Sequence, residues 1–186
     1  MAHHICPWWL GYFHVSPLRR LVESPTKLLA PLVREGMVVV EPGCGMGFFT
    51  LHAARMVGHS GRVVAVDLQE RMLRGLERRA RRAGLSGRIE RRLATAGDLG
   101  VEDLAGAVDL ALALHVVHEV PDQAAFFGQL AHTLKPGGGL LVVEPKGHVK
   151  QVDLEQSLSL AEGQGLTVDS TASLPIERSA LLLRSD

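Results

Sequence analysis

Short apolar runs recur along the chain and are separated by stretches in which apolar residues return with helical spacing. Runs at residues 37–40, 63–66 and 108–114 have the length and apolar character of buried strands, and residues 89–93 predict a further short strand. Residues 68–83 predict a helix whose buried stripe is Leu68, Met72, Leu73, Leu76, Ala80 and Ala83. Strands that alternate with helices predict a parallel sheet with helices on both faces.

The C-terminal part of the chain continues this alternation. Residues 153–164 predict a helix that ends near Gly163 and Gly165, and residues 166–170 and 180–184 predict two closing strands. The sequence contains no internal repeat and no low-complexity tract. We therefore expect a single α/β domain.

The composition agrees with one soluble domain of 186 residues, with 46% apolar residues and a formal net charge of zero. The length suits a substantial core, and the balanced charge argues against disorder and against a nucleic-acid-binding surface. No apolar stretch is long enough to span a bilayer, the N-terminus lacks the pattern of a signal peptide, and two cysteines are too few for a disulfide framework. We expect a cytoplasmic protein that binds neither a membrane nor nucleic acid.

Nine arginines fall between residues 71 and 92. A row of this kind could form a phosphate-binding face. Because the predicted helix 68–83 already has its buried stripe on another face, we favour a solvated helix surface.

A glycine-rich turn follows the first predicted strand. Glu41 is followed by glycines at alternate positions, Gly43, Gly45 and Gly47, and a helix is predicted to open at residue 48 or 49. Glycines permit a sharp turn and a close approach of the backbone to a ligand, and a helix start offers N–H groups to an anionic group. The dinucleotide fingerprint would need its third glycine at Phe48, which argues against a nicotinamide-dependent oxidoreductase.

An acidic residue, Asp67, ends the second predicted strand and lies 20 residues after Gly47. A carboxylate at this place suits acceptance of hydrogen bonds from ribose hydroxyls. The alternative is a helix N-cap for the predicted helix 68–83.

Together these features resemble the class I S-adenosylmethionine-dependent methyltransferases over roughly residues 36–145. The turn resembles motif I, and Asp109, which opens a strand, resembles motif IV together with the following segment from His115 to Asp122. Residues 134–145 resemble the Leu-Lys-Pro-Gly-Gly turn and fifth strand of the family. The resemblance implies a Rossmann-like, seven-stranded, mostly parallel sheet with helices on both faces and an antiparallel last strand. It also implies a methyltransferase that uses S-adenosylmethionine and releases S-adenosylhomocysteine.

The resemblance further implies roles for single residues. The turn passes under the methionine part of the cofactor, Glu41 positions its ammonium group, and Asp67 receives the ribose. An acidic residue after the third strand contacts the adenine; Asp98 arrives about three residues late for this, so Thr95 is an alternative. The implied cofactor-binding residues are Glu41, Gly43, Cys44, Gly45, Gly47, Asp67, Leu68, Asp98 and His115.

The N-terminal segment, residues 1–35, is the candidate lid over a methyltransferase domain of residues 36–186. Both tryptophans and the only tyrosine of the chain lie within five residues of one another. Large aromatic side chains cover apolar surface and attract cations, so we favour a cap over the sulfonium and the substrate. The alternatives are a plug at the sheet edge or the contact of a homodimer. The candidate substrate and lid residues are Cys6, Trp8, Trp9 and Tyr12.

His115 and His118 follow the fourth strand, where the pocket of such sheets opens. Either could remove a proton from an acceptor or position it, and the alternative is a histidine that caps a helix or packs under the cofactor. The chain lacks the Asn/Asp-Pro-Pro-Tyr signature of enzymes that methylate amide or base nitrogens. We therefore expect a small-molecule acceptor and O-, S- or C-methylation.

Two other functions remain open at this point. One is a non-catalytic S-adenosylmethionine-binding or sensor protein with the same fold. The other is a metal- or metalloid-linked methyltransferase that uses Cys6 and Cys44 with nearby histidines, although the spacing matches no strong zinc signature and our preferred interpretation includes no metal. The histidines and acidic residues considered for this site are His3, His4, His14, His115, His118, Glu119 and His148.

Overall fold

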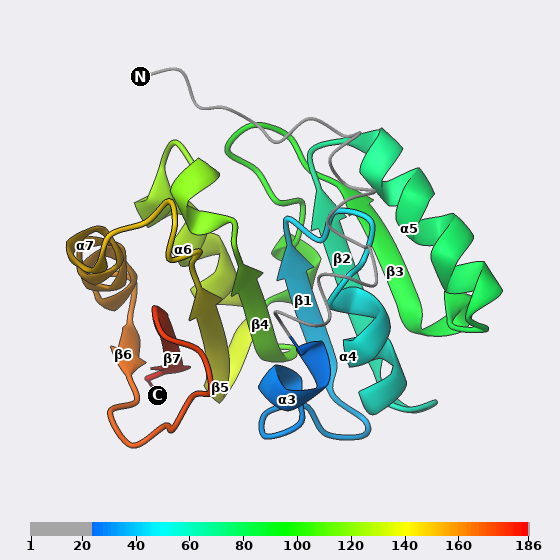
Figure 1. Cartoon of the computed structure of the whole chain (residues 1–186), viewed down its shortest axis with the longest axis horizontal. Coiled ribbons are helices and arrows are strands. Elements are labelled where there is room, and N and C mark those ends of the chain that lie inside the picture. Colours follow the sequence, from blue (N-terminus) through cyan, green and yellow to red (C-terminus); the bar gives the residue numbers. More distant parts are fainter. Residues whose placement is uncertain (1–23, 186) are drawn as a thin grey trace.

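The computed structural model describes residues 24–185, which form a central sheet flanked by helices (Figure 1). The strands are β1 (Val38–Pro42), β2 (Arg62–Asp67), β3 (Ile89–Leu93), β4 (Val108–Leu114), β5 (Leu134–Val143), β6 (Leu166–Val168) and β7 (Ser179–Arg184). The α-helices are α3 (Pro25–Leu29), α4 (Thr50–Met56), α5 (Glu70–Arg82), α6 (Gln123–Thr133) and α7 (Gln151–Glu162). Short 3₁₀ turns are η1 (Ser86–Arg88), η2 (Glu102–Leu104) and η3 (Val117–Glu119).

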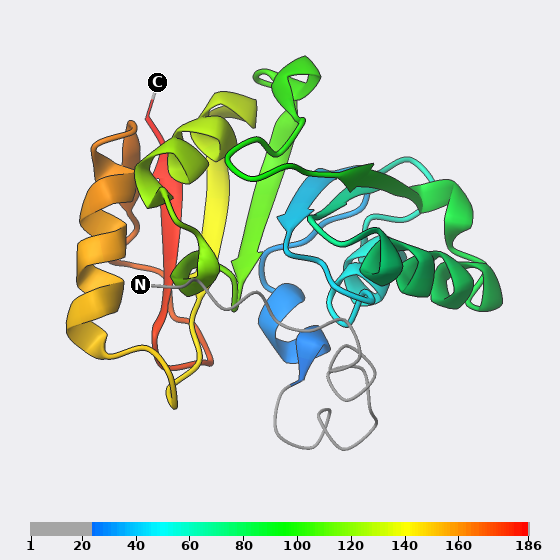
Figure 2. The same ribbon diagram turned by 90° about the horizontal axis from the view of Figure 1, so that it is seen from above.

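The sheet has the strand order β3-β2-β1-β4-β5-β7-β6. Strands β1 to β5 pair in parallel, whereas β7 is antiparallel to both β5 and β6. The helices α3, α4 and α5 lie on one face of the sheet and α6 and α7 on the other (Figure 2). The predicted Rossmann-like α/β fold with an antiparallel last strand is confirmed.

Alternate residues of each central strand enter two separate apolar clusters, one on each face of the sheet. In β4, Leu110, Leu112 and Leu114 join the cluster beneath α3, α4 and α5, whereas Ala111 and Ala113 join the cluster beneath α6 and α7. Successive side chains of a strand point to opposite faces, so both faces must be apolar where helices cover both. This is why these strands are continuous apolar runs.

The element boundaries follow the sequence prediction closely in the central strands. β3 and β4 have the predicted bounds, whereas β1 extends to Pro42 and α4 begins at Thr50, just after the predicted opening at residue 48 or 49. The predicted ends of α5 were wrong: Leu68 and Ala83 lie outside the helix and are exposed, so neither belongs to its buried stripe.

Two C-terminal predictions also need correction. α7 runs from residue 151 to residue 162, two residues earlier than predicted at each end, because Asp153 accepts a hydrogen bond from the Lys150 N–H (3.1 Å) and so occupies the third helical position. β6 ends at Val168, two residues early, because the Asp169 side chain accepts hydrogen bonds from Thr171 and turns the chain there.

The segment assigned to the lid overlaps the body of the domain. α3 lies within residues 1–35, and its Leu28 and Leu29 are fully buried in the cluster beneath α3, α4 and α5. The boundary after residue 35 stays a prediction. Over residues 24–185, no helix is long and apolar enough to cross a membrane.

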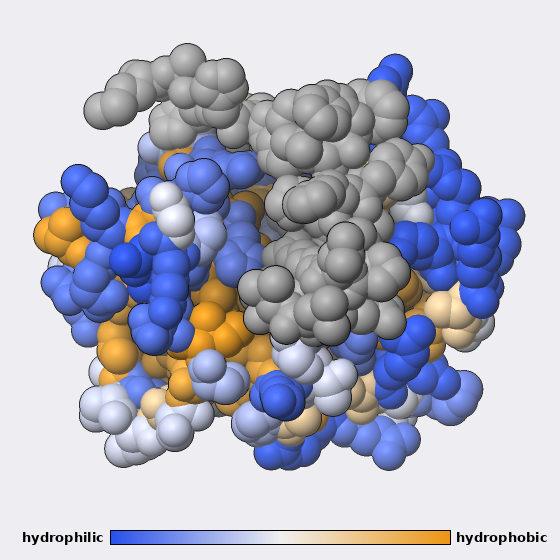
Figure 3. All heavy atoms as spheres, in the orientation of Figure 1, coloured by the Kyte–Doolittle hydropathy of each residue, from blue (hydrophilic) through white to orange (hydrophobic). Residues whose placement is uncertain are grey.

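The arginine-rich segment is mostly a solvated surface, as expected. Six of its nine arginines are exposed, and hydrophilic residues cover the side of the molecule that carries α5 (Figure 3). The exceptions are Arg79, Arg88 and Arg92, which are partly buried and donate to the backbone carbonyl oxygens of other elements.

Candidate active site

The chain turns sharply directly after β1. Gly43, Gly45 and Gly47 have φ angles of +69°, +54° and +79°, in the left-handed region that side chains disfavour. The Cys44 N–H donates to the Val66 carbonyl oxygen (3.1 Å), which holds the turn against the end of β2. The glycine turn predicted from the sequence is therefore present at the carboxyl edge of the sheet.

The three glycines have three different surroundings. A methyl group on Gly43 would lie 2.6 Å from Cγ2 of Val116, in the segment that follows β4. A methyl group on Gly47 would overlap Cδ1 of Leu76, in α5. Among residues 24–185, a methyl group on Gly45 would meet nothing within 4 Å. Gly43 and Gly47 are thus required by packing, whereas the described residues leave space at Gly45 that a ligand can enter.

The Asp67 carboxylate braces this turn. Its Oδ2 accepts from the N–H of Gly45 (2.9 Å), and its Oδ1 accepts from the N–H of Gln69 (2.8 Å). Burial raises the pKa of Asp67, and the two backbone hydrogen bonds oppose that rise. Glu41, only 2% exposed, lies at the end of the neighbouring strand β1. The N-cap of α5 is Gln69, so helix capping alone does not account for Asp67.

Cys44 lies buried inside the turn. Its thiol donates to the carbonyl oxygen of Gly45, with an S···O distance of 3.6 Å. Burial raises the pKa of the Cys44 thiol well above its ordinary value, and the charges of Asp67 and Glu41 raise it further. The thiol is therefore protonated at neutral pH, and a protonated thiol is a poor ligand for a metal or metalloid.

Helix α5 holds the turn from the other side. The Met46 side chain packs against Gly75, where a Cβ would lie 2.8 Å from Cγ of Met46. The Arg79 guanidinium donates from Nη1 to the Met46 carbonyl oxygen. The sequence analysis missed this role of Arg79, because nothing local distinguishes it from its neighbouring arginines.

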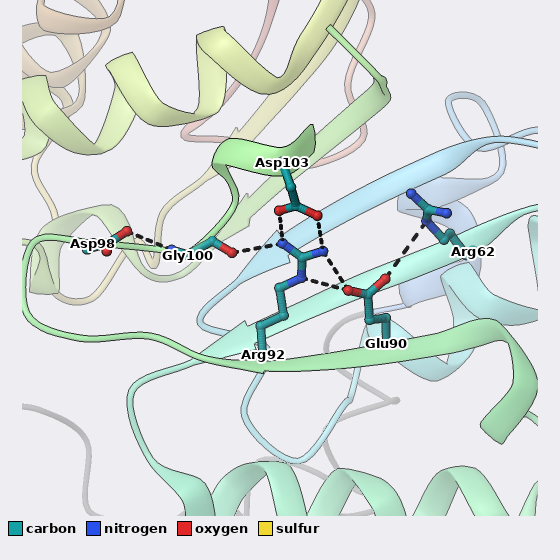
Figure 4. A network of polar contacts seen from close by, with 6 residues as sticks. All are labelled: Arg62, Glu90, Arg92, Asp98, Gly100 and Asp103. Carbon is teal, nitrogen blue, oxygen red and sulfur yellow. Dashed lines mark hydrogen bonds and ion pairs between the residues drawn. The ribbon is translucent and has the colours of Figure 1, made fainter. Parts of the chain in front are cut away.

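A network of charged residues fixes the loop that follows β3 (Figure 4). Arg92 donates to the Gly100 carbonyl oxygen (2.8 Å) and pairs with the carboxylates of Asp103 and Glu90. The Gly100 N–H donates to Oδ1 of Asp98 (2.8 Å). The hydrogen bonds from Arg92 hold the pKa of Asp103 below its ordinary value. Arg92 thus anchors the loop that carries Asp98.

Apolar side chains lie near Asp67 at the carboxyl ends of β2 and β3. Leu68 is 46% exposed, and Leu93, which pairs with Asp67 across the two strands, is 57% exposed. The exposed Asp98 pairs backbone to backbone with Thr95 (N···O 2.9 Å) in the loop beyond β3. This part of the edge combines hydrogen-bonding groups with apolar surface.

His115 begins the segment after β4 in a strained conformation. Its φ is +58°, which is uncommon for a residue with a side chain, and its N–H donates to the Val143 carbonyl oxygen (2.7 Å). Its ring lies 6.1 Å, centroid to centroid, from that of Phe49 at the start of α4. Such strain clusters at functional sites, and here it places the His115 ring near the residues that follow the glycine turn.

His118 forms a close pair with Glu144, the residue that follows β5. His118 Nδ1 lies 2.5 Å from Oε2 of Glu144, whose Oε1 accepts from the Val117 N–H (2.9 Å). Glu144 is 3% exposed. The hydrogen bond to Glu144 raises the pKa of His118, and burial opposes the rise in part. Glu144 was not among the predicted site residues; the available signal was a charged residue directly after a buried apolar strand.

An open cleft of about 300 Å³ lies beside this pair, between η3, the end of β5 and α7. Its walls include His118, Glu144, Gln123, His148 and Ser157. Most of the lining residues are polar. The described structure thus brings together His118 and His148 but leaves His115 out of this cleft.

The metal hypothesis finds no support among residues 24–185, which contain no group of three or more histidine, cysteine, aspartate or glutamate side chains suited to an ion. The predicted convergence of His115, His118, Glu119 and His148 on an ion is therefore not found. The N-terminal candidates for the metal site lie outside the described residues, and these are His3, His4, Cys6 and His14. The predicted lid residues Trp8, Trp9 and Tyr12 lie outside them as well.

Comparisons with known proteins identify the family and the fold. The sequence model of a family described as a methyltransferase domain matches residues 33–171. The chain is 34% identical over 112 residues to the ubiquinone/menaquinone biosynthesis C-methyltransferase UbiE of Enterobacter sp. strain 638, which covers 60% of this chain and 44% of that protein. UbiE of Escherichia coli strain K12 / DH10B gives 33% identity over the same lengths. The chain thus spans less than half the length of these relatives.

Solved structures share the fold. A SAM-dependent methyltransferase from Aquifex aeolicus superimposes with a TM-score of 0.82 and 21% identity, covering 96% of this chain and 98% of that one. The [4+2]-cyclase SpnF gives a TM-score of 0.66 and 24% identity, with coverages of 78% and 58%. The family match, which covers most of the chain, and the glycine turn between two acidic strand ends lead to one conclusion: this chain belongs to the methyltransferase-domain family and is a class I S-adenosylmethionine-dependent methyltransferase.

Proposed function

We propose that the protein binds S-adenosylmethionine across the carboxyl ends of β1, β2 and β3 and transfers its methyl group to a small-molecule acceptor. The observation that carries this proposal is Gly45, whose Cα faces space that residues 24–185 leave open while its N–H is held by Asp67. A side chain at residue 45 would fill the space that the ligand needs. The residues present therefore fit the cofactor.

The positions of the cofactor-binding residues support the roles that we propose for them. Glu41 and the turn receive the methionine part, with Glu41 supplying a buried negative charge for its ammonium group. Asp67 accepts the ribose hydroxyls, and Leu68 supplies apolar surface for the adenine, near Asp98. Cys44 contributes its backbone rather than its protonated thiol.

When bound, the cofactor supplies an activated methyl group on a sulfonium, so the protein contributes mainly position and proton removal. His115 and His118 are the candidates for proton removal or for positioning the acceptor. The matched relatives are named as C-methyltransferases of ubiquinone and menaquinone biosynthesis, which supports a small organic acceptor. The size of the cleft also supports a small molecule.

Calorimetric titration with S-adenosylmethionine, S-adenosylhomocysteine and NAD tests the cofactor. We expect micromolar binding of the first two and no response to NAD. The Asp67→Asn variant should bind both at least about tenfold more weakly, because a charged acceptor of the ribose hydroxyls is lost. Binding of NAD alone would contradict the proposal. Unchanged affinity in the Asp67→Asn variant would contradict only the role proposed for Asp67.

A further inference from the structure

The segment after β4 connects the glycine turn to the polar cleft. Val116 lies directly against Gly43 of the turn, and His118, two residues later, lines the cleft. Two residues span at most about 7 Å. The His118 end of the cleft therefore lies within about 7 Å, Cα to Cα, of Val116, the residue that packs against the turn.

The wall of the cleft is held by a chain of hydrogen bonds. The Gln123 side chain donates to the Val117 carbonyl oxygen (3.1 Å) and accepts from the Ser157 hydroxyl (2.7 Å). Glu144 accepts from the N–H of the same Val117 (2.9 Å). These bonds tie η3, the end of β5, α6 and α7 into one polar wall. Preformed walls of this kind fix the orientation of a polar ligand.

The ionisable groups around His118 come from η3, the end of β5, the loop before α7 and α7 itself. Glu144 follows β5, Glu119 belongs to η3, His148 lies in the loop before α7, and Asp153 lies in its first turn. Of these, Glu144 contacts His118 directly. Carboxylates and imidazoles suit hydroxyl groups as hydrogen-bond partners and are costly to cover with a purely apolar molecule.

We propose that this cleft is the acceptor site and takes a small molecule with an ionisable hydroxyl, with His118 as the proton acceptor and Glu144 as its positioning residue. This inference rests on the proposed function. The volume of the cleft, about 300 Å³, is at the small end of ligand sites, so the cleft suits a single-ring or smaller acceptor.

Glu144 acts through His118. Its Oε2 accepts the Nδ1–H of His118, and its Oε1 holds the Val117 N–H, which fixes both the tautomer and the ring orientation. Nε2 then carries the lone pair, and within residues 24–185 no other hydrogen bond of the His118 ring competes for it. The acceptor oxygen forms a bond to the methyl carbon as the carbon–sulfur bond breaks and its electron pair stays on sulfur. The hydroxyl proton passes to Nε2 of His118, and Glu144 stabilises the resulting imidazolium.

The first experiment measures the His118 ring itself by imidazole NMR during a pH titration, with His118→Gln used to assign the signal. In the Glu144→Gln variant, the pKa of His118 should fall below its value in the unaltered protein. Glu162→Gln is the matched control, because Glu162 is exposed at the end of α7 and should leave the titration unchanged. Equal His118 titration in Glu144→Gln and the unaltered protein would overturn the role of Glu144.

The second experiment measures methyl transfer to catechol, 2-mercaptoethanol and benzylamine, with S-adenosylhomocysteine affinity measured in parallel. We expect transfer to catechol that rises with pH as His118 loses its proton. His118→Gln should lower this rate about 100-fold, and Glu144→Gln should lower it at least about tenfold and move the rise to lower pH. Affinity for S-adenosylhomocysteine should stay unchanged in both variants.

Each outcome decides between the two proposals. Protein that binds S-adenosylhomocysteine but methylates only the thiol or the amine, or none of the three probes, overturns the hydroxyl acceptor while leaving the proposed function intact. Transfer to catechol at the normal rate in His118→Gln overturns the acceptor site. Protein that binds neither cofactor form contradicts the proposed function itself.

Discussion

The glycines at residues 43, 45 and 47 look equivalent in the sequence, yet the structure gives each a different task. Gly43 leaves room for the side chain of Val116 and Gly47 for that of Leu76, so both glycines allow other elements to pack against the turn. Of the three, Gly45 alone faces space that the described part of the chain leaves open. Spacing could predict the turn, because glycine tolerates positive φ. It could not distinguish these tasks, because each depends on residues distant in the sequence.

Substitution of these glycines separates packing from binding. Gly45→Ala adds a methyl group that meets nothing within residues 24–185, so we expect only the modest cost of a left-handed alanine, about 1 kcal/mol. The same methyl group enters the ligand space, so affinity for S-adenosylhomocysteine should fall at least about tenfold. Urea unfolding and calorimetry measure the two effects.

Gly47→Ala is the counterpart. Its methyl group overlaps the fully buried Leu76, so unfolding free energy should drop by about 2–4 kcal/mol from overpacking and backbone strain together. If Gly45→Ala bound S-adenosylhomocysteine as tightly as the unaltered protein, the assignment of Gly45 to the ligand side would be wrong.

Site residues differ in how far the sequence could predict them. Asp67 could be found because the order strand, turn, helix and second strand places it at a known position relative to the turn. Glu144 offered only the signal of a charged residue directly after a buried strand, and Arg79 offered none, because their partners, His118 and Met46, lie 26 and 33 residues away in the sequence. Their contacts exist only once the strands and α5 are assembled.

At the scale of elements, α5 does more than cover the sheet. Its Leu76 fills the space over Gly47, its Gly75 accommodates Met46, and its Arg79 holds the Met46 carbonyl oxygen. The hydrophobic pattern predicted the helix and most of its buried stripe. It could not place the ends, because Leu68 and Ala83 continue the helical spacing beyond the residues that touch the sheet.

From this contact we predict that Arg79 positions the glycine turn for the cofactor. Arg79→Ala should weaken S-adenosylhomocysteine binding about tenfold, because the turn loses a charge-assisted hydrogen bond that fixes its shape. Arg79→Lys should restore part of the affinity. Calorimetry measures both, at a temperature where circular dichroism shows each variant folded.

Arg82→Ala is the matched control for Arg79. It removes the same charge from the same helix at an exposed position, so affinity should not change. Equal affinity in the Arg79→Ala and Arg82→Ala variants would mean that the contact with Met46 has no part in cofactor binding.

At the scale of the whole molecule, the fold could be predicted because each central strand must be apolar on both faces. That requirement appears in the sequence as continuous apolar runs at β2 and β4. Together with the helical patterns between them, these runs predict a sheet covered by helices on both faces. The reversed direction of β7 came only from the family resemblance, because an apolar run does not encode strand direction. β6 was the least predictable strand, since only three of its residues pair with β7.

The lid hypothesis also belongs to this scale, and it concerns residues outside those that the structure describes. Deletion of residues 1–16 should abolish methyl transfer while leaving a folded domain, because the core clusters of the described residues begin at Leu28. Circular dichroism and thermal unfolding measure the fold, and methyl transfer to catechol measures turnover. Both tryptophans lie within the deleted segment, so in the full chain their fluorescence should change on addition of S-adenosylhomocysteine. A folded, truncated protein that methylates at the normal rate would exclude a lid. The aromatic residues would then be assigned to packing at the sheet edge or to a dimer contact.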